Sequence, residues 1–238
     1  MTELSCPSPE LTGDRLPVLT APDGPSANAS PSTWDDRLRR ALDVSLASAA
    51  LVVLSAPMLL IALCIRSTSR GPALFRQQRV GLNGRPFTFY KFRTMRLDSS
   101  DAAHRELIVR ELHGEDTKVN GSCKLAADPR ITRFGGWLRR TSLDELPQLI
   151  NVLRGEMTLV GPRPCQEWEA AMFPAEFQDR FTVLPGLTGL WQVRGRSTLG
   201  TLDMLKLDAE YVRSRTVRLD LRILASTLPS MLRGDGAR

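Results

Sequence analysis

The sequence has very few histidines and no paired cysteine motif, which argues against several kinds of catalytic and metal site. His104 and His113 are its only histidines, so neither a His-based triad nor a multi-histidine metal site is indicated. The four cysteines are widely scattered without a Cys-x-x-Cys pair, which argues against a disulfide framework or a zinc site. We interpret them as reduced thiols in a cytoplasmic setting. Any chemistry must therefore come from carboxylates and arginines.

Length and charge set the next bounds. The chain of 238 residues is long enough for one domain with a sizeable core, and a second full domain is not expected. Lys and Arg outnumber Asp and Glu by 32 to 26, which gives a net charge of +6 and suits anionic partners. Residues 1–33 are rich in Pro, Ser, Ala, Gly and Thr, so we predict a disordered tail without the features of a signal peptide.

One apolar segment carries the strongest physical signal. No charge occurs from Val44 to Ile65, a length that would cross a ~30 Å hydrocarbon layer as a straight helix. Pro57 lies near its middle and predicts a sharp bend, where Ser55 could bond to freed backbone groups. Basic residues flank both ends, which favours a helix that breaks at Pro57 and returns to the same membrane face. A kinked transmembrane helix and a buried core helix are the alternatives.

The remaining sequence predicts a mostly helical α/β domain. Residues 73–80 and 87–95 have strand patterns, and Asn83-Gly84 between them indicates a hairpin. Helical patterns cover residues 98–115 and 131–153, the second interrupted by Gly135-Gly136 and Pro147. Two further amphipathic helices are predicted over 202–212 and 219–232, and such helices lie either at a membrane interface or on a soluble core.

Asp144 and Glu145 are adjacent carboxylates just before a predicted helix. The helix N-terminus favours negative charge, which would keep an aspartate ionised as a nucleophile. The neighbouring glutamate suits Mg²⁺, and Arg139 or Arg140 could neutralise phosphate oxygens. The alternative is purely structural, because Ser142 to Glu145 also spells a capping box, S-x-x-E.

Two other clusters suit anionic ligands. Pro162 and Pro164 fix the backbone on either side of Arg163, so that its guanidinium is presented with little entropy to lose. Residues 184–196 combine glycines with Trp191, Arg194 and Arg196, which could contact phosphates or lipid head groups. Each cluster could instead be a plain surface turn or a loop that shapes the core.

Taken together, these stretches resemble the monotopic phosphoglycosyl transferases, also called bacterial sugar transferases. The likeness runs from about Trp34 to Leu232. It is carried, in chain order, by residues 39–43 (RRALD), 75–81 (FRQQRVG), 90–95 (YKFRTM), 142–148 (SLDELPQ), 151–157 (NVLRGEM) and 161–164 (GPRP). The chain departs from the family in Ala56, where serine is usual before the proline, and in Leu184, where many members have arginine.

The resemblance implies a ping-pong reaction. The aspartate matching Asp144 attacks the β-phosphate of a UDP-sugar, forms a covalent phosphosugar-aspartate and releases UMP. Polyprenyl phosphate then takes up the phosphosugar, which initiates a surface glycan. The resemblance also implies that Glu145 binds Mg²⁺. Substrate binding falls on Arg139, Lys91, Pro162, Arg163 and Pro164, and membrane anchoring on Arg39, Arg40, Ser55 and Pro57.

We therefore expect three segments: the tail, a re-entrant membrane helix over 34–70, and a compact catalytic domain over 71–238. This domain would lie on the cytoplasmic face of the inner membrane, with a small β-hairpin and amphipathic interfacial helices. Its expected partners are a UDP-sugar, polyprenyl phosphate, membrane lipids and, as an option, a second copy of the chain. A catalytically silent scaffold for glycan assembly is the alternative function. A nucleic-acid binder has only the net charge in its favour, and no nucleic-acid partner is expected.

Overall fold

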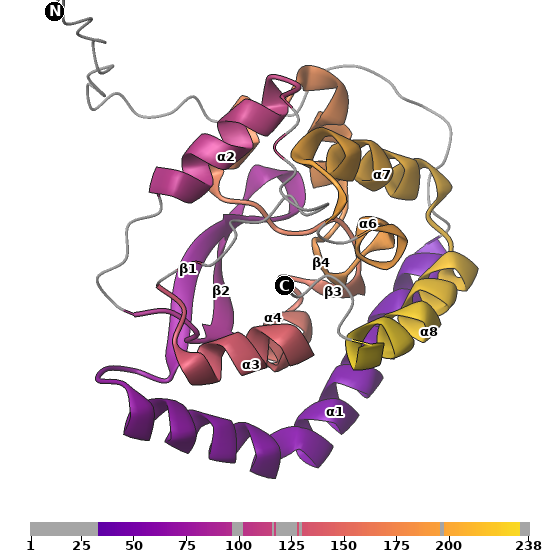
Figure 1. Cartoon of the computed structure of the whole chain (residues 1–238). Coiled ribbons are helices and arrows are strands. Elements are labelled where there is room, and N and C mark those ends of the chain that lie inside the picture. Colours follow the sequence, from indigo (N-terminus) through magenta and orange to yellow (C-terminus); the bar gives the residue numbers. More distant parts are fainter. Residues whose placement is uncertain are drawn as a thin grey trace, which may run out of the picture.

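The computed structural model describes residues 33–96, 102–115, 117, 128, 130–195 and 198–233. Nearly all of the predicted tail and most of residues 116–129 therefore lie outside the described residues. The chain forms helices around two small sheets (Figure 1). The elements are α1 (Thr33–Thr68), β1 (Leu74–Val80), β2 (Pro86–Phe92), α2 (Ala102–Leu112), α3 (Arg133–Thr141), α4 (Gln148–Arg154), β3 (Thr158–Val160), α5 (Glu167–Met172), β4 (Gly186–Thr188), α6 (Leu190–Arg194), α7 (Thr201–Ser214) and α8 (Val217–Arg233), with 3-10 helices at Leu82–Gly84, Leu143–Glu145 and Ala175–Thr182.

The apolar segment forms most of α1, a single helix of 36 residues. Figure 1 shows α1 changing direction between the part beside α8 and the part beneath α3, so the predicted bend is present. The helix continues through Pro57, so the predicted helix-break-helix is a bent, uninterrupted helix. The reason is that a proline has a helical φ and removes only one backbone donor. Ser55 donates to the carbonyl of Val52 at 2.8 Å, one residue before the carbonyl that the proline leaves free.

Only one face of α1 contacts the rest of the protein. Ala47 in its first half, and Ile61 and Ile65 in its second half, are buried in two different hydrophobic clusters. Val52 and Val53 on other faces are 75% and 74% exposed. By length and composition, α1 is the one helix among the described residues that could cross a membrane. Both halves nevertheless pack against the same domain.

The predicted hairpin is confirmed. Strands β1 and β2 pair antiparallel from Leu74 opposite Phe92 to Val80 opposite Pro86. Asn83 and Gly84 both have positive φ angles, 53° and 73°, which asparagine and glycine tolerate better than other residues. Phe87 and Phe89 of β2 are buried in the main core. Lys91 lies near the open end of the hairpin, opposite Phe75.

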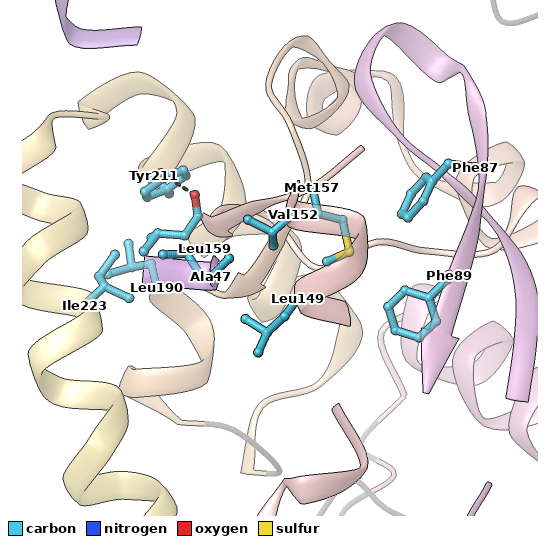
Figure 2. Packing of buried hydrophobic residues seen from close by; sticks show 11 residues of the cluster. Ala47, Phe87, Phe89, Leu149, Val152, Met157, Leu159, Leu190, Tyr211 and Ile223 are labelled. Carbon is cyan, nitrogen blue, oxygen red and sulfur yellow. Dashed lines mark hydrogen bonds between the residues drawn. The ribbon is translucent and has the colours of Figure 1, made fainter. Parts of the chain in front are cut away.

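The main core lies between the hairpin, α4 and α8 (Figure 2). Leu149 and Val152 of α4, together with Met157, pack between the two hairpin phenylalanines and the side of the cluster that contains Ile223 of α8. The buried hydroxyl of Tyr211 donates to the carbonyl of Val160 at 2.9 Å, which ties α7 to β3. The predicted helices over 202–212 and 219–232 are thus confirmed, and both pack on this core.

A short parallel pair, β3 and β4, was not predicted. Thr158 lies opposite Gly186, and Val160 lies opposite Thr188. Two glycines allow the close approach: a Cβ on Gly161 would lie 2.5 Å from the carbonyl oxygen of Leu184, and a Cβ on Gly186 would lie even closer to the amide nitrogen of Gly161. This contact fixes the start of the turn that contains Arg163.

Candidate active site

Strand β2 and the 3-10 helix Leu143–Glu145 place Lys91 beside two adjacent carboxylates, those of Asp144 and Glu145, which we call the dyad. Lys91 Nζ of β2 lies 2.8 Å from Glu145 Oε1 and 3.5 Å from Asp144 Oδ2. The Asp144 side chain is buried, whereas that of Glu145 is 19% exposed. The site therefore contains a buried carboxylate beside a more accessible one, joined by a shared lysine.

The backbone before the dyad takes an unusual turn. Helix α3 ends at Ser142, which has a left-handed conformation with φ 55° and ψ 16°. The Ser142 side chain makes no capping hydrogen bond to the turn that follows, and the Glu145 carboxylate contacts Lys91 instead of the backbone of Ser142. The structural alternative, a capping box, is therefore wrong. A capping serine typically has an extended backbone, whereas Ser142 is held in the left-handed conformation that ends α3.

The two carboxylates have opposite pKa shifts. Burial raises the pKa of Asp144, and the adjacent Glu145 raises it further, although Lys91 opposes both effects. Burial acts in the same direction on Glu145, but the positive charges of Lys91 and Arg163 outweigh it and hold the pKa of Glu145 at about 2. Burial therefore moves the pKa of Asp144 in the direction opposite to the one expected from a helix N-terminus.

The Gly-Pro-Arg-Pro turn faces the dyad. Arg163 NH1 lies 3.4 Å from Glu145 Oε1, and its side chain remains 36% exposed. Pro162 and Pro164 are buried on either side. The carbonyl of Pro162 accepts from the amide of Gly186 at 2.8 Å, so β4 helps to position the turn. Lys91, Asp144, Glu145 and Arg163 therefore lie together in one place, and the roles that the resemblance implies for them stay predictions.

Arg139 lies at the edge of this group. It is an exposed residue in the last turn of α3, and its positive charge lowers the pKa of Asp144 and of Asp128 through space. In the third cluster, Arg194 pairs with Glu210 at 2.8 Å on the surface, and the buried indole nitrogen of Trp191 has no hydrogen-bond partner. Arg196 lies outside the described residues.

Arg39 and Arg40 fasten α1 to the domain. Arg39 Nε donates to Asp220 of α8 at 2.7 Å, and the Arg39 side chain is buried. Arg40 donates to the carbonyls of Val152 and Leu153 at 2.6 and 2.8 Å, which satisfies the end of α4. The membrane-anchoring role that the resemblance implies for Arg39 and Arg40 stays a prediction.

The donor set suits a weakly held divalent cation. The described residues contain no group of three or more His, Cys, Asp or Glu side chains placed to hold a metal ion. Mg²⁺ commonly binds through one or two carboxylates and completes its shell with water and substrate phosphates. An ionised, partly exposed Glu145 beside Asp144 fits that pattern.

The comparison with known proteins decides the family. A model of the family described as bacterial sugar transferase matches residues 34–234, nearly all of the described chain. The chain belongs to the bacterial sugar transferase family. The resemblance of the sequence to phosphoglycosyl transferases is thereby confirmed.

Members of the family from several bacteria are similar to this chain. The UDP-glucose:undecaprenyl-phosphate glucose-1-phosphate transferase of Caulobacter vibrioides is 42% identical over 238 residues, which cover 94% of this chain and 80% of that protein. The exopolysaccharide production protein ExoY of Rhizobium meliloti is 36% identical over 199 residues, 84% of this chain and 87% of that protein. The galactosyl transferase CpsE of Streptococcus agalactiae is 40% identical over 201 residues, 84% of this chain but 43% of its own length.

Proposed function

We propose that this family member transfers a sugar-1-phosphate from a UDP-sugar to polyprenyl phosphate, releases UMP and thereby initiates an exopolysaccharide. The observation that carries the proposal is the meeting of Lys91 and Arg163 with the Asp144–Glu145 dyad. Two cations around two carboxylates suit phosphoryl transfer, in which charge on phosphate oxygens must be neutralised. The names of the relatives in Caulobacter vibrioides and Rhizobium meliloti support both the reaction and the product class.

The proposed chemistry proceeds in two displacements. An Asp144 carboxylate oxygen attacks the β-phosphorus of the donor, and the bond from this phosphorus to the bridging oxygen of UMP breaks. A phosphate oxygen of polyprenyl phosphate then attacks the same phosphorus and releases the Asp144 carboxylate. Burial favours this role because a desolvated carboxylate is a stronger nucleophile once ionised. Lys91 and Arg163 orient the donor phosphates against it.

We further propose that Glu145, with donor phosphate oxygens, holds Mg²⁺. The ion would supply additional positive charge where the phosphate charge develops. The low pKa of Glu145 supports this assignment, since the group is ionised at every working pH. Lys91 would then be freed from Glu145 to contact the donor phosphates.

We propose the re-entrant topology for α1. Both halves of the helix pack on one domain, through Ala47 in one cluster and Ile61 and Ile65 in another. A helix that crossed the bilayer would carry one of these halves to the opposite side. We expect cysteines introduced at Trp34 and Ser69 to be protected from a membrane-impermeant maleimide in intact spheroplasts and to be labelled once the membrane is permeabilised. Labelling of only one of the two in intact spheroplasts would contradict the proposal.

The test of the reaction is a single-turnover assay of UMP release. The purified protein with a panel of UDP-sugars, Mg²⁺ and no acceptor should release about one UMP per enzyme, and polyprenyl phosphate should convert this burst to turnover. Asp144→Asn should abolish the burst, and Glu145→Gln should lower its rate at least about a hundredfold. Asp203→Asn, which removes an exposed carboxylate of α7, is the matched control.

Several outcomes would contradict the proposal. Full turnover by Asp144→Asn would remove the covalent mechanism. Absence of UMP release from the unsubstituted protein with every donor, while membrane association is retained, would favour the catalytically silent scaffold.

A further inference from the structure

A buried ion pair lies behind the Gly-Pro-Arg-Pro turn, in a place that the sequence analysis missed. Arg180 of the 3-10 helix Ala175–Thr182 donates to Asp208 of α7 through NH2 at 2.7 Å. The two side chains are only 2% and 1% exposed. The guanidinium also lies over the rings of Phe173 and Phe181, at 5.0 and 5.4 Å from their centroids. No pattern in the sequence marks this pair, because its members are 28 residues apart.

The pair is a costly way to fill a core. Burial raises the pKa of Asp208 to about 6, even though Arg180 lowers it, so that the carboxylate is still charged at pH 7. Two further guanidinium nitrogens of Arg180, Nε and NH1, are buried without a nitrogen or oxygen partner. Replacing a buried ion pair by apolar residues of similar volume is often neutral or stabilising. Stability alone therefore gives a weak reason for a charge at this position.

The second bond of Arg180 gives a stronger reason. The same NH2 group that meets Asp208 also donates to the main-chain carbonyl of Arg163 at 2.8 Å. An NH2 group has two hydrogens, so both bonds form at once. Asp208 thus fixes the guanidinium, and the guanidinium fixes a carbonyl in the turn that faces Glu145.

That carbonyl is a main-chain group of the turn that neither the two prolines nor β4 holds. The rings of Pro162 and Pro164 fix φ at both neighbouring positions, and Pro164 restricts Arg163 to extended conformations. The amide of Gly186 already holds the carbonyl of Pro162. The bond from Arg180 therefore sets the rotation about ψ of Arg163, and with it the direction in which the Arg163 backbone presents its side chain.

We propose that Arg180, held by Asp208, is a positioning residue for the donor: it fixes the Arg163 carbonyl and so directs the Arg163 guanidinium at the phosphates of the UDP-sugar. This inference rests on the proposed function. Arg180 touches neither the substrate nor the reacting atoms, and acts only through Arg163. Its loss should therefore weaken donor binding more than it slows the transfer step.

A double-mutant cycle tests this route. Arg180→Met should raise the donor KM and the Kd for UMP, measured by calorimetry, about tenfold, with a smaller change in kcat. Arg163→Ala alone should weaken UMP binding at least as much. In the Arg163→Ala background, Arg180→Met should add less than about a twofold change, because the group that it positions is gone. Independent, multiplying effects of the two substitutions would overturn the proposal.

A second variant separates positioning from folding. Arg180→Met leaves Asp208 as an unpaired buried charge and could simply unfold the protein. Arg180→Met combined with Asp208→Leu removes both charges, and we expect it to keep the melting temperature of the unsubstituted protein but to retain the weakened UMP binding. UMP binding of unsubstituted strength in this folded variant would also overturn the proposal.

A remote pair and the unsubstituted protein complete the design. Arg39→Met breaks another buried ion pair of the same 2.7 Å length, between α1 and α8. It should lower the melting temperature while the fraction that remains folded binds UMP normally. A loss of UMP affinity in folded Arg39→Met as large as in Arg180→Met would overturn the specific role of Arg180. If the unsubstituted protein binds no uridine nucleotide at all, the proposed function fails, and the positioning inference fails with it.

Discussion

At the scale of single residues, Asp144 and Glu145 show how one shared lysine creates two different carboxylates. Lys91 is closer to Glu145 than to Asp144, by 2.8 Å against 3.5 Å, and Arg163 adds its charge on the Glu145 side. Asp144 is left with burial as the dominant influence on its pKa. Neighbours in the sequence thus have opposite pKa shifts, which suits the different roles that we propose for them, a nucleophile and an ionised metal ligand.

Removing the shared lysine should move the pH dependence of the reaction. Lys91 is the largest influence that lowers the pKa of Asp144, so Lys91→Met should raise that pKa further. The nucleophile would then be protonated at a higher pH, and the acid limb of the pH profile of kcat/KM should move toward higher pH. The profile is measured by UMP release with one donor.

The shape of the profile separates this effect from a general loss of substrate binding. Arg76→Met removes an exposed cation from the neighbouring strand β1 and should leave the acid limb in place. An acid limb unchanged in Lys91→Met, or moved equally in both variants, would show that Lys91 does not control Asp144.

At this scale the sequence predicts the charged residues better than their supports. Asp144, Glu145 and Arg163 are singled out as adjacent carboxylates and a Pro-Arg-Pro turn, and the family resemblance is what assigns them to one site. Arg180 and Asp208 are missed because their contact depends on the packing of α7, which no local pattern encodes. The capping box fails for a similar reason: the motif S-x-x-E is local, but the backbone at Ser142 is set by the end of α3.

At the scale of elements, α3 shows that two adjacent glycines need not share a role. The sequence suggests that Gly135-Gly136 interrupts a helix, yet α3 runs through both. A Cβ on Gly135 would clash with the carbonyl oxygen of Thr94, whereas the nearest atoms to a Cβ on Gly136 are 3.7 Å away. Gly135 therefore allows α3 to lie against the chain just after β2, and Gly136 has no such contact.

Alanine at these two positions should have opposite effects on stability. Gly135→Ala should lower the free energy of unfolding by about 2 kcal/mol, because the clash is with main chain and α3 must move. Gly136→Ala should raise it by about 1 kcal/mol, because alanine favours the helix. Denaturant titration of both variants in the same detergent measures the difference, and Gly135→Ala should also slow UMP release by moving the dyad relative to Lys91.

Gly136→Ala is the matched control, since it makes the same chemical change one residue away. Equal stability of the two variants would mean that α3 does not approach Thr94 as closely as described.

The β-hairpin, unlike this helix packing, is predicted correctly because turn residues and strand patterns agree locally. Strands β3 and β4 are too short, at three residues each, for any alternation to appear.

At the scale of the whole molecule, α1 is part of the folded domain as well as an apolar surface. Its first half is joined to α8 by Arg39 and Asp220, residues 181 positions apart in the sequence. The Asp220 carboxylate also meets the hydroxyl of Tyr211 at 2.7 Å. Length and charge pattern predict an apolar helix, but its attachment along both halves could not be predicted. The first half depends on Asp220 near the other end of the chain, and the second half on Phe92 and Leu138.

Breaking this attachment should destabilise the whole protein. Asp220→Asn leaves Arg39 buried without its closest anionic partner and should lower the free energy of unfolding by about 3 kcal/mol. Arg39→Met combined with Asp220→Leu removes both charges and should recover most of the loss, because Tyr211 can still donate to Val160. Both variants are measured by denaturant titration in one detergent.

An exposed ion pair of equal length is the control that isolates burial. Arg110 Nε and Glu115 Oε2 also lie 2.7 Å apart, but both side chains are about half exposed. Arg110→Met should therefore leave the free energy of unfolding unchanged. If Asp220→Asn were as stable as Arg110→Met, the contact between α1 and α8 would not hold the fold together. In that case α1 could leave the domain, and the geometric support for a helix that returns to the same membrane face would be lost.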